Sequence, residues 1–278
     1  MYLATIEQFA NVAEKKIAML KSHPFPLWVS AMLAGAYVGF GIILIMTLGH
    51  DAEPAVRKLI MGTAFGIALT LVVLAGSDLF TGYTMYFSIA GLRRRVGWRD
   101  GLKISLYVWL GNLAGAFLLA LIYRFGVGEL VQSPDALIQS IAAKKMNGAA
   151  SELFFRAVLC NWLVCLALWM SARVDSDIAR CAVIFWCLFA FIASGFEHSV
   201  ANMTVFSLAL LGPAAEGVSV LGAAHNLLWV SLGNTVGGAV LTGAAYVAIA
   251  AADIKPAALT PASNQQPQPE RESPQQCN

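Results

Sequence analysis

Two short polar clusters stand inside long stretches of the chain that are otherwise free of charge. Gly-Ser-Asp-Leu-Phe-Thr-Gly occupies residues 76–82, and Ser-Gly-Phe-Glu-His-Ser occupies residues 194–199. Asp78 is the one charged residue in a stretch of 34, and Glu197 is the one in a stretch of 35. Ionisable side chains at depth in apolar segments are functional hypotheses by default. The chemistry of this protein is therefore expected at these two clusters.

His198 is the strongest single candidate. Histidine titrates near neutrality when its surroundings do not perturb it. It can donate a hydrogen bond to an anion, or give it a proton so that a neutral acid crosses an apolar constriction. Either hydrogen-bond donation or proton transfer is needed, because an unpaired ion in an apolar environment has a very high free energy. A structural histidine, satisfied within a packed core, is the alternative. Thr81 in the other cluster offers a hydroxyl donor, or else a local helix cap.

The other buried polar side chains are expected to support these two. Asp78 and Glu197 are predicted to cap free backbone N–H groups of the clusters, since a carboxylate would repel an anion. Asn161 and Asn234 are amides inside apolar stretches. They either hold neighbouring helices together or orient His198 or a substrate.

The composition indicates that the chain is embedded in a membrane. Of the 278 residues 58% are hydrophobic and 12% are charged, whereas a soluble domain carries about 25% charged residues. A membrane span needs about 20 apolar residues, and six such elements are predicted. They lie near residues 27–48, 59–92, 104–124, 153–172, 181–215 and 224–251.

The second and fifth elements are too long to be simple spans. A continuous helix of either length would measure about 50 Å, far more than the hydrocarbon core. We expect each to break at its polar cluster, near the middle of the membrane. A half-helix that begins there directs free N–H groups and a positive dipole end inward, which favours an anion.

The landmarks of the first half recur in the second. Leu-Gly-Asn-x-x-Gly occurs at residues 110–115 and again at 232–237, 122 positions later, and the two acids are 119 positions apart. Because each half holds three spans, the halves should be inverted relative to each other, with the substrate region between them. The predicted fold is an all-α integral membrane protein with a 3+3 inverted repeat, about residues 25–125 and 150–252.

Basic residues outside the spans predict the orientation. Twelve Lys and Arg side chains fall on one side and five on the other, so both termini are expected in the cytoplasm. Residues 1–24 are predicted to form an amphipathic helix, either on the inner membrane surface or against a neighbouring subunit. Residues 253–278, rich in Pro, Gln and Ser, are expected to be a disordered cytoplasmic tail. Three basic residues would collect anions at an outer vestibule or be solvated surface charges: Lys144, Lys145 and Arg156.

Two other classes of protein are weighed against a small-anion pathway. An aquaporin-type channel for neutral solutes is expected to carry an Asn-Pro-Ala box at the start of each half-helix. None of the ten prolines is in either polar cluster. A membrane enzyme or haem-anchoring subunit would want paired histidines, a His-Glu-x-x-His motif or a nucleophile elbow. The remaining histidines, His23, His50 and His225, lie near span ends and make no obvious pair. We therefore expect no enzyme activity, no cofactor and no metal.

Three segments resemble signatures of the formate/nitrite transporter family: residues 76–82, 160–167 and 195–202. The resemblance covers about residues 1–250 and is strongest to the family's bacterial nitrite channels. It implies an aquaporin-like protomer, a homopentamer with one pore per subunit, and a place in the bacterial inner membrane. Nitrite is the favoured substrate, while formate or hydrosulfide would use the same site. Passive conduction and proton-coupled transport both stay open.

The resemblance also assigns roles by motif position. His198 and Thr81 would form the centre of the pore. Asp78 stands where many family members carry glutamate, which preserves the charge. In this family the N-terminal helix has been linked to pore closure. By the same resemblance, Asn161 and Asn234 would be polar neighbours of the His198–Thr81 pair, and Lys145 would lie in the vestibule. The outer apolar constriction would be formed by Phe65 and Phe191. The inner one would be formed by Leu69, Phe80 and Val164.

Overall fold

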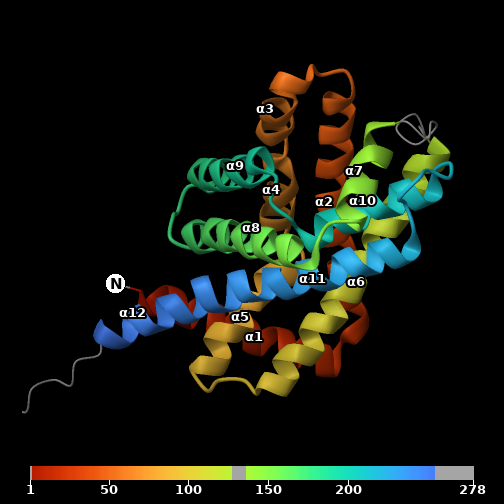
Figure 1. Ribbon diagram of the computed structural model, residues 1–278. Coiled ribbons are helices and arrows are strands. Elements are labelled where there is room, and N and C mark those ends of the chain that lie inside the picture. Colours follow the sequence, from red (N-terminus) through yellow and green to blue (C-terminus); the bar gives the residue numbers. More distant parts are fainter. Residues whose placement is uncertain (1, 127–135, 254–278) are drawn as a thin grey trace, which may run out of the picture.

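The computed structural model describes residues 2–126 and 136–253, and within these ranges every regular element is helical (Figure 1). The tail predicted for residues 254–278 lies outside the described residues. Six helical segments of the described chain are long and apolar enough to cross a membrane, and they overlap the six predicted elements. They are Pro24–His50, Pro54–Ala75, Trp98–Gly126, Ala150–Ser171, Asp177–Ser194 and Val220–Ala251.

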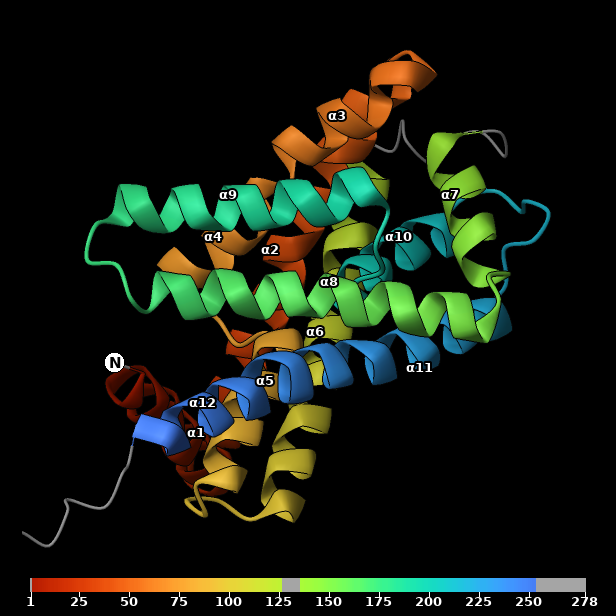
Figure 2. The ribbon, with the colours of Figure 1, turned by 60° about the vertical axis from the view of Figure 1, so that its left-hand side comes forward.

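The helices fall into two groups along the chain. The first comprises α1 Leu3–Ser22, α2 Pro24–His50, α3 Pro54–Ala64, α4 Gly66–Ala75, α5 Phe80–Leu92 and α6 Trp98–Gly126. The second comprises α7 Leu137–Met146, α8 Ala150–Ser171, α9 Asp177–Ser194, α10 Ser199–Leu211, α11 Val220–Val236, the π-helical η2 Gly237–Ala244 and α12 Ala245–Asp253. Helix α8 lies between α9 and α11, as both ribbon views show (Figure 2). Helix α7 is a short element that sequence patterning did not predict.

Both polar clusters coincide with helix ends. Gly76 ends α4 with φ 76°, and Gly195 ends α9 with φ 72°. This left-handed conformation strains any residue with a Cβ, so glycine is the natural stop signal. The next helix starts only a few residues later, α5 at Phe80 and α10 at Ser199. Each polar cluster therefore supplies a short non-helical segment between two helices.

The glycines of the repeated Leu-Gly-Asn-x-x-Gly motif allow helices to touch backbone to backbone. A Cβ on Gly115 of α6 would overlap the Met32 carbonyl oxygen of α2. A Cβ on Gly237 would likewise overlap the Val158 carbonyl oxygen of α8. Without a hydrophobic driving force inside lipid, close approach of this kind is a main source of helix–helix affinity.

Helix α1 packs on its own chain. Its apolar face is buried in the main core of the protein, against α5, α2 and α6. Its position at the inner membrane surface or against a neighbouring subunit stays a prediction, since one face of the helix is engaged with its own chain. The buried side chains are Ile6, Phe9, Ala10, Ala13 and Ile17.

The polar face of α1 is fastened by a group of charges. The Arg95 guanidinium donates to both carboxylate oxygens of Glu14, at 2.7 and 2.8 Å, and to Glu7 at 2.7 Å. Arg93 donates to Glu7 at 3.0 Å. The hydrogen bond from Arg95 holds the pKa of Glu14 below its ordinary value of 4.5. A carboxyl whose pKa is lowered on folding stabilises the contact above its unfolded pKa, and this contribution is lost as pH falls through the folded pKa.

Glu14→Gln is expected to loosen α1 at neutral pH, because the exposed clamp loses its charged acceptor. Hydrogen exchange of the α1 amides, corrected for intrinsic rates, should be a few-fold faster than in wild type at pH 7. The difference should disappear at a pH below the folded pKa of Glu14, because the Glu14 carboxyl of wild type is then protonated and uncharged, like the glutamine. Lys15→Gln, at an exposed neighbour, should leave exchange unchanged. Equal exchange in Glu14→Gln and wild type at pH 7 would show that the clamp does not hold α1.

Candidate functional site

His198 and Thr81 meet in the interior of the described chain. Thr81 lies in the first turn of α5, and His198 is the residue that caps α10. The Thr81 hydroxyl oxygen is 3.1 Å from His198 Nε2, and both side chains are buried. Two residues 117 positions apart, one from each polar cluster, are thereby brought into direct contact.

The second ring nitrogen of His198 fixes how the imidazole can act. The backbone N–H of Ala201 donates to His198 Nδ1 at 3.0 Å. A nitrogen that accepts from an N–H carries no proton itself, so the neutral ring bears its proton on Nε2. The Nε2–H group then faces Thr81. A doubly protonated ring would set Nδ1–H against the Ala201 N–H, which is unfavourable.

A small apolar cavity adjoins His198. Its volume is about 10 Å³, near the lower limit for one water molecule. The rings of Phe65 and Phe191 meet edge to face in its wall, with centroids 5.5 Å apart, and the Phe191 ring is 6.0 Å from that of His198. The lining residues are Val38, Phe65, Ala68, Leu69, Leu79, Val164, Leu188, Phe191 and His198.

Among the described residues the two acids are paired with lysines, whereas backbone N–H groups of the clusters were the expected partners. Lys16 Nζ lies 2.7 and 2.9 Å from the Asp78 carboxylate oxygens, and Lys145 Nζ lies 2.8 Å from Glu197. Each carboxylate accepts a second bond from the residue five positions later, the Tyr83 hydroxyl at 2.7 Å in the first cluster. In the second cluster, Asn202 Nδ2 donates to Glu197 at 2.7 Å.

The backbone of the clusters is held instead by two asparagines from the repeated motif. Asn112 accepts from the Phe80 N–H at 2.9 Å and donates to the carbonyls of Asp78 and Ala31. The second asparagine, Asn234, makes the corresponding bonds with Ser199, Glu197 and Ala157. Asn234 thus contacts the backbone on both sides of His198 and that of α8, while a role in orienting the imidazole or a substrate stays a prediction. Asn112 was not singled out as a site residue, although its motif marked the position.

Asn161 connects the two clusters. Its Nδ2 lies 3.1 Å from the Thr81 carbonyl oxygen, 3.0 Å from Thr84 Oγ1 and 2.6 Å from the Asn234 carbonyl oxygen. Its own side-chain oxygen is buried without a hydrogen-bond partner among the described residues. Asn161 thus ties α5, which carries Thr81, to α11, which fastens the His198 segment.

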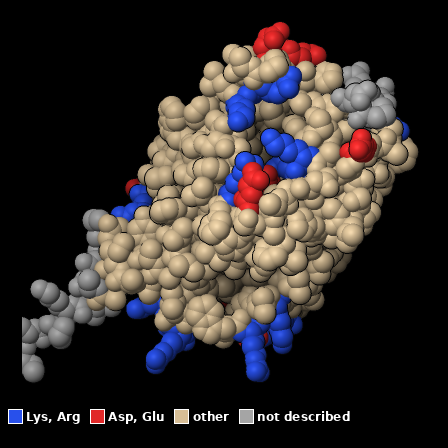
Figure 3. Space-filling model, in the orientation of Figure 1, with Lys and Arg blue, Asp and Glu red and all other residues tan. Residues whose placement is uncertain are grey.

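The basic residues predicted for an outer vestibule divide into separate roles. Lys145 sits on α7 and pairs with Glu197, while Lys144 next to it is exposed. Arg156 on α8 pairs with Glu152 at 2.5 Å and is partly exposed. The space-filling view shows basic side chains on the upper part of the face and along its lower edge, with a few more at its left edge (Figure 3).

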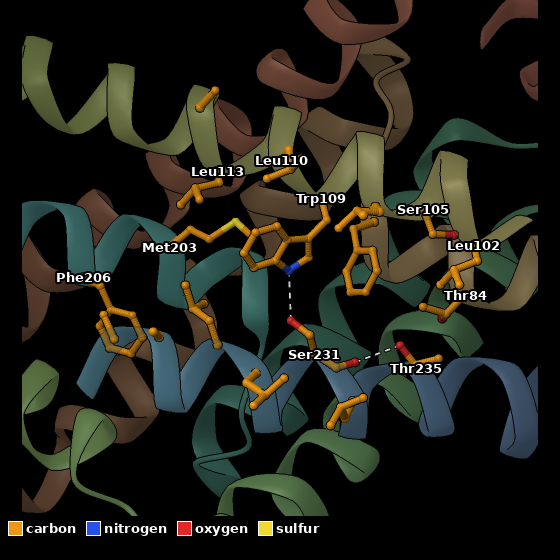
Figure 4. Close-up of a pocket in the computed structure, with 18 of the residues that line it drawn as sticks. Thr84, Leu102, Ser105, Trp109, Leu110, Leu113, Met203, Phe206, Ser231 and Thr235 are labelled. Atoms are coloured by element: carbon orange, nitrogen blue, oxygen red, sulfur yellow. Dashed lines mark hydrogen bonds between the residues drawn. The ribbon is translucent and has the colours of Figure 1, made fainter. Parts of the chain in front are cut away.

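Phe80 is placed apart from the other predicted constriction residues. It lines a separate, wide groove of about 1260 Å³, walled mainly by α5, α6, α10 and α11. The groove is apolar, and the Trp109 Nε1–H group on its wall is satisfied by Ser231 Oγ at 2.9 Å (Figure 4). Leu69 and Val164, by contrast, line the small cavity beside His198.

Comparison with known proteins places the chain in one family. A profile described as formate/nitrite transporter matches residues 3–248. The chain is 47% identical over 246 residues to the nitrite transporter NirC of Salmonella typhimurium, with 88% of this chain and 91% of the relative covered. This confirms the resemblance to nitrite channels noted in the sequence.

Solved structures agree with that placement. An FNT family ion channel matches with a TM-score of 0.87 at 46% identity, covering 89% of this chain and 99% of the other. A pentameric formate channel with formate bound matches with a TM-score of 0.69 at 26% identity, covering 82% and 97%. The protein is a multi-pass membrane protein whose relatives are transporters and channels rather than enzymes, and it belongs to the formate/nitrite transporter family.

Proposed function

We propose that this chain carries nitrite across the bacterial inner membrane, through a pore in each protomer of a homopentamer. The observation that carries the proposal is the buried Thr81–His198 contact of 3.1 Å beside an apolar cavity. A polar pair enclosed by phenylalanine, leucine and valine side chains is suited to a small ion that sheds water before it passes. Pentameric assembly is supported by the pentamer named for one structural relative.

His198 acts in this proposal as a hydrogen-bond donor. Because Nδ1 is occupied by the Ala201 N–H, the neutral ring offers Nε2–H, and Thr81 holds that proton in place until an anion arrives. The starts of α5 and α10 add the positive ends of two helix dipoles to the same region. Donation from a neutral ring therefore fits the geometry better than a lasting positive charge on the imidazole does. Passage of the ion as neutral nitrous acid stays open as a second route.

The pathway is proposed to run between two inverted halves. The supporting observation is that the same contacts occur twice: a left-handed glycine, an acid with its lysine, and an asparagine that binds the next helix start. We take α4–α5 and α9–α10 as spans interrupted near mid-membrane, in an aquaporin-like arrangement. Phe65 and Phe191 would narrow the pore on the outer side of His198, and Leu69 and Val164 on the inner side.

The proposed orientation has both termini in the cytoplasm. Helix α1 and the Arg93–Arg95 segment lie at one end of the molecule and bind each other there. Their basic residues belong on the cytoplasmic side by the positive-inside rule. Lys145 would then lie near the outer mouth, where its cation offsets the Glu197 carboxylate that would otherwise repel an anion.

Nitrite is preferred over formate because of the 47% identity to a nitrite transporter. Formate is the second candidate, favoured by the relative whose structure holds formate. Hydrosulfide would use the same site. None of the relatives named above is described as a neutral-solute channel.

The test is nitrite uptake into proteoliposomes with a set pH gradient. Wild type should take up nitrite well above protein-free vesicles. His198→Asn should lower uptake about tenfold or more, or change its pH dependence, because the donor between the two proposed constrictions is altered. His225→Asn changes a histidine that contacts the Gly148 carbonyl oxygen outside the cavity, and it should match wild type. Unchanged uptake across pH in His198→Asn would remove the imidazole from the mechanism.

A further inference from the structure

Thr84 is a buried polar residue that neither the family motifs nor the proposed pore centre includes. It lies on α5 one turn after Thr81, and its side chain reaches the wall of the groove as well as the interior (Figure 4). Its hydroxyl donates to the Thr81 carbonyl oxygen at 2.7 Å and accepts from Asn161 Nδ2 at 3.0 Å. Both hydrogen-bonding functions of the hydroxyl are therefore engaged inside the protein.

Several side-chain donors lie close to the Thr81 carbonyl oxygen. Thr84 Oγ1 and Asn161 Nδ2 both reach it, and the Cys165 thiol approaches to 3.5 Å. These bonds lie in the protein interior, since Thr81, Thr84 and Asn161 are all buried, and a buried polar group that loses its partner is costly. The donors therefore define where the Thr81 backbone sits, and the backbone determines where the Thr81 hydroxyl points.

The π-helix η2 packs directly against these hydrogen-bonded side chains. A Cβ on Gly238 would overlap Thr84 Oγ1 and would lie 2.7 Å from Asn161 Nδ2 and 2.9 Å from Cys165 Sγ. One turn further along α5, Ser88 donates to the Ala239 carbonyl oxygen of the same π-helix at 2.7 Å. A π-helical segment alters the usual backbone hydrogen bonding, and such segments are frequent at functional sites.

We propose that Thr84 is a positioning residue of the pore centre. Its hydroxyl, seated on Gly238 and bound to Asn161, keeps the Thr81 hydroxyl against His198 Nε2. The role rests on the function proposed above, since its effect on transport passes through the Thr81–His198 contact. Loss of the hydroxyl lets that contact lengthen, and the donor geometry offered to the anion becomes less favourable.

Thr84→Val tests this, because valine keeps the shape of threonine and removes the hydroxyl. Nitrite uptake should fall about fivefold, the effect of one hydrogen bond, and Thr84→Ser should restore it to within about twofold. In a Thr81→Val background, Thr84→Val should cause little further loss, since residues that act through one another are not additive. Should valine prevent assembly, Thr84→Ala in the same pairings carries the test.

A second measurement does not depend on transport. In protein labelled with ¹⁵N-histidine, the His198 Nε2 resonance should move in Thr84→Val and stay in place in Thr84→Ser, with His198→Asn providing the assignment. Wild-type uptake equal to that of empty vesicles would overturn the proposed function alone. An unmoved resonance, or an equal loss of uptake with and without Thr81, would overturn the role of Thr84.

Discussion

Asn234→Leu is expected to prevent stable folding of this protein. Leucine is close to asparagine in size, but it supplies no partner for the Ser199 N–H or for the carbonyls of Glu197 and Ala157. Asn234 is fully buried, and each unsatisfied buried group costs about 1–3 kcal/mol. The summed loss, on the order of 3 to 5 kcal/mol, is a large part of a normal folding free energy. Thermal unfolding in detergent and the yield of assembled protein measure it.

A matched control separates burial from the mere loss of an amide. Asn147 at the end of α7 also donates to two backbone carbonyls, those of Ala143 and Gly217, but it is exposed. Water can replace those bonds, so Asn147→Leu should cost less than about 1 kcal/mol. Asn112→Leu should instead behave like Asn234→Leu, because it makes the corresponding contacts. A midpoint for Asn234→Leu within a few degrees of wild type would show that the caps do not hold the polar clusters.

The repeated motif shows what sequence reasoning reaches and where it stops. The recurrence of Leu-Gly-Asn-x-x-Gly and the lengths of the uncharged stretches predicted that equivalent structures flank two polar clusters. The glycine spacing is visible as a pattern, because close helix packing needs it at fixed intervals. The bonds of each asparagine are not visible, since the partners lie as far as 81 residues away in sequence and any buried amide suits several of them.

The lysine partners of the acids were missed for the same reason. Lys16 was counted among the charges that set orientation, and nothing in the sequence of α1 points to Asp78, 62 residues later. Only the packing of the apolar face of α1 on its own chain brings the two together. The π-helix could not be predicted from the sequence either, because residues 237–244 are small and mostly apolar, as in an ordinary α-helix.

Removing Lys145 alone should be more damaging than removing the charge from both members of its ion pair. Lys145→Met leaves the Glu197 carboxylate, whose side chain is only 4% exposed, with Asn202 as its remaining hydrogen-bond partner among the described side chains. An uncompensated buried charge costs about 3–5 kcal/mol. The lower end is expected here, because the lysine side chain is itself 21% exposed.

The double variant Lys145→Met, Glu197→Gln should recover most of that loss, since a neutral glutamine can keep the bond to Asn202. Replacing a buried ion pair by neutral groups is often close to neutral for stability. Melting temperatures of the two single variants and the double variant complete the cycle. Additive losses would mean that the ammonium group and the carboxylate are each solvated separately. Recovery in the double variant would mean that the fold can be kept without the ion pair, and that the loss in Lys145→Met comes from the uncompensated Glu197 carboxylate.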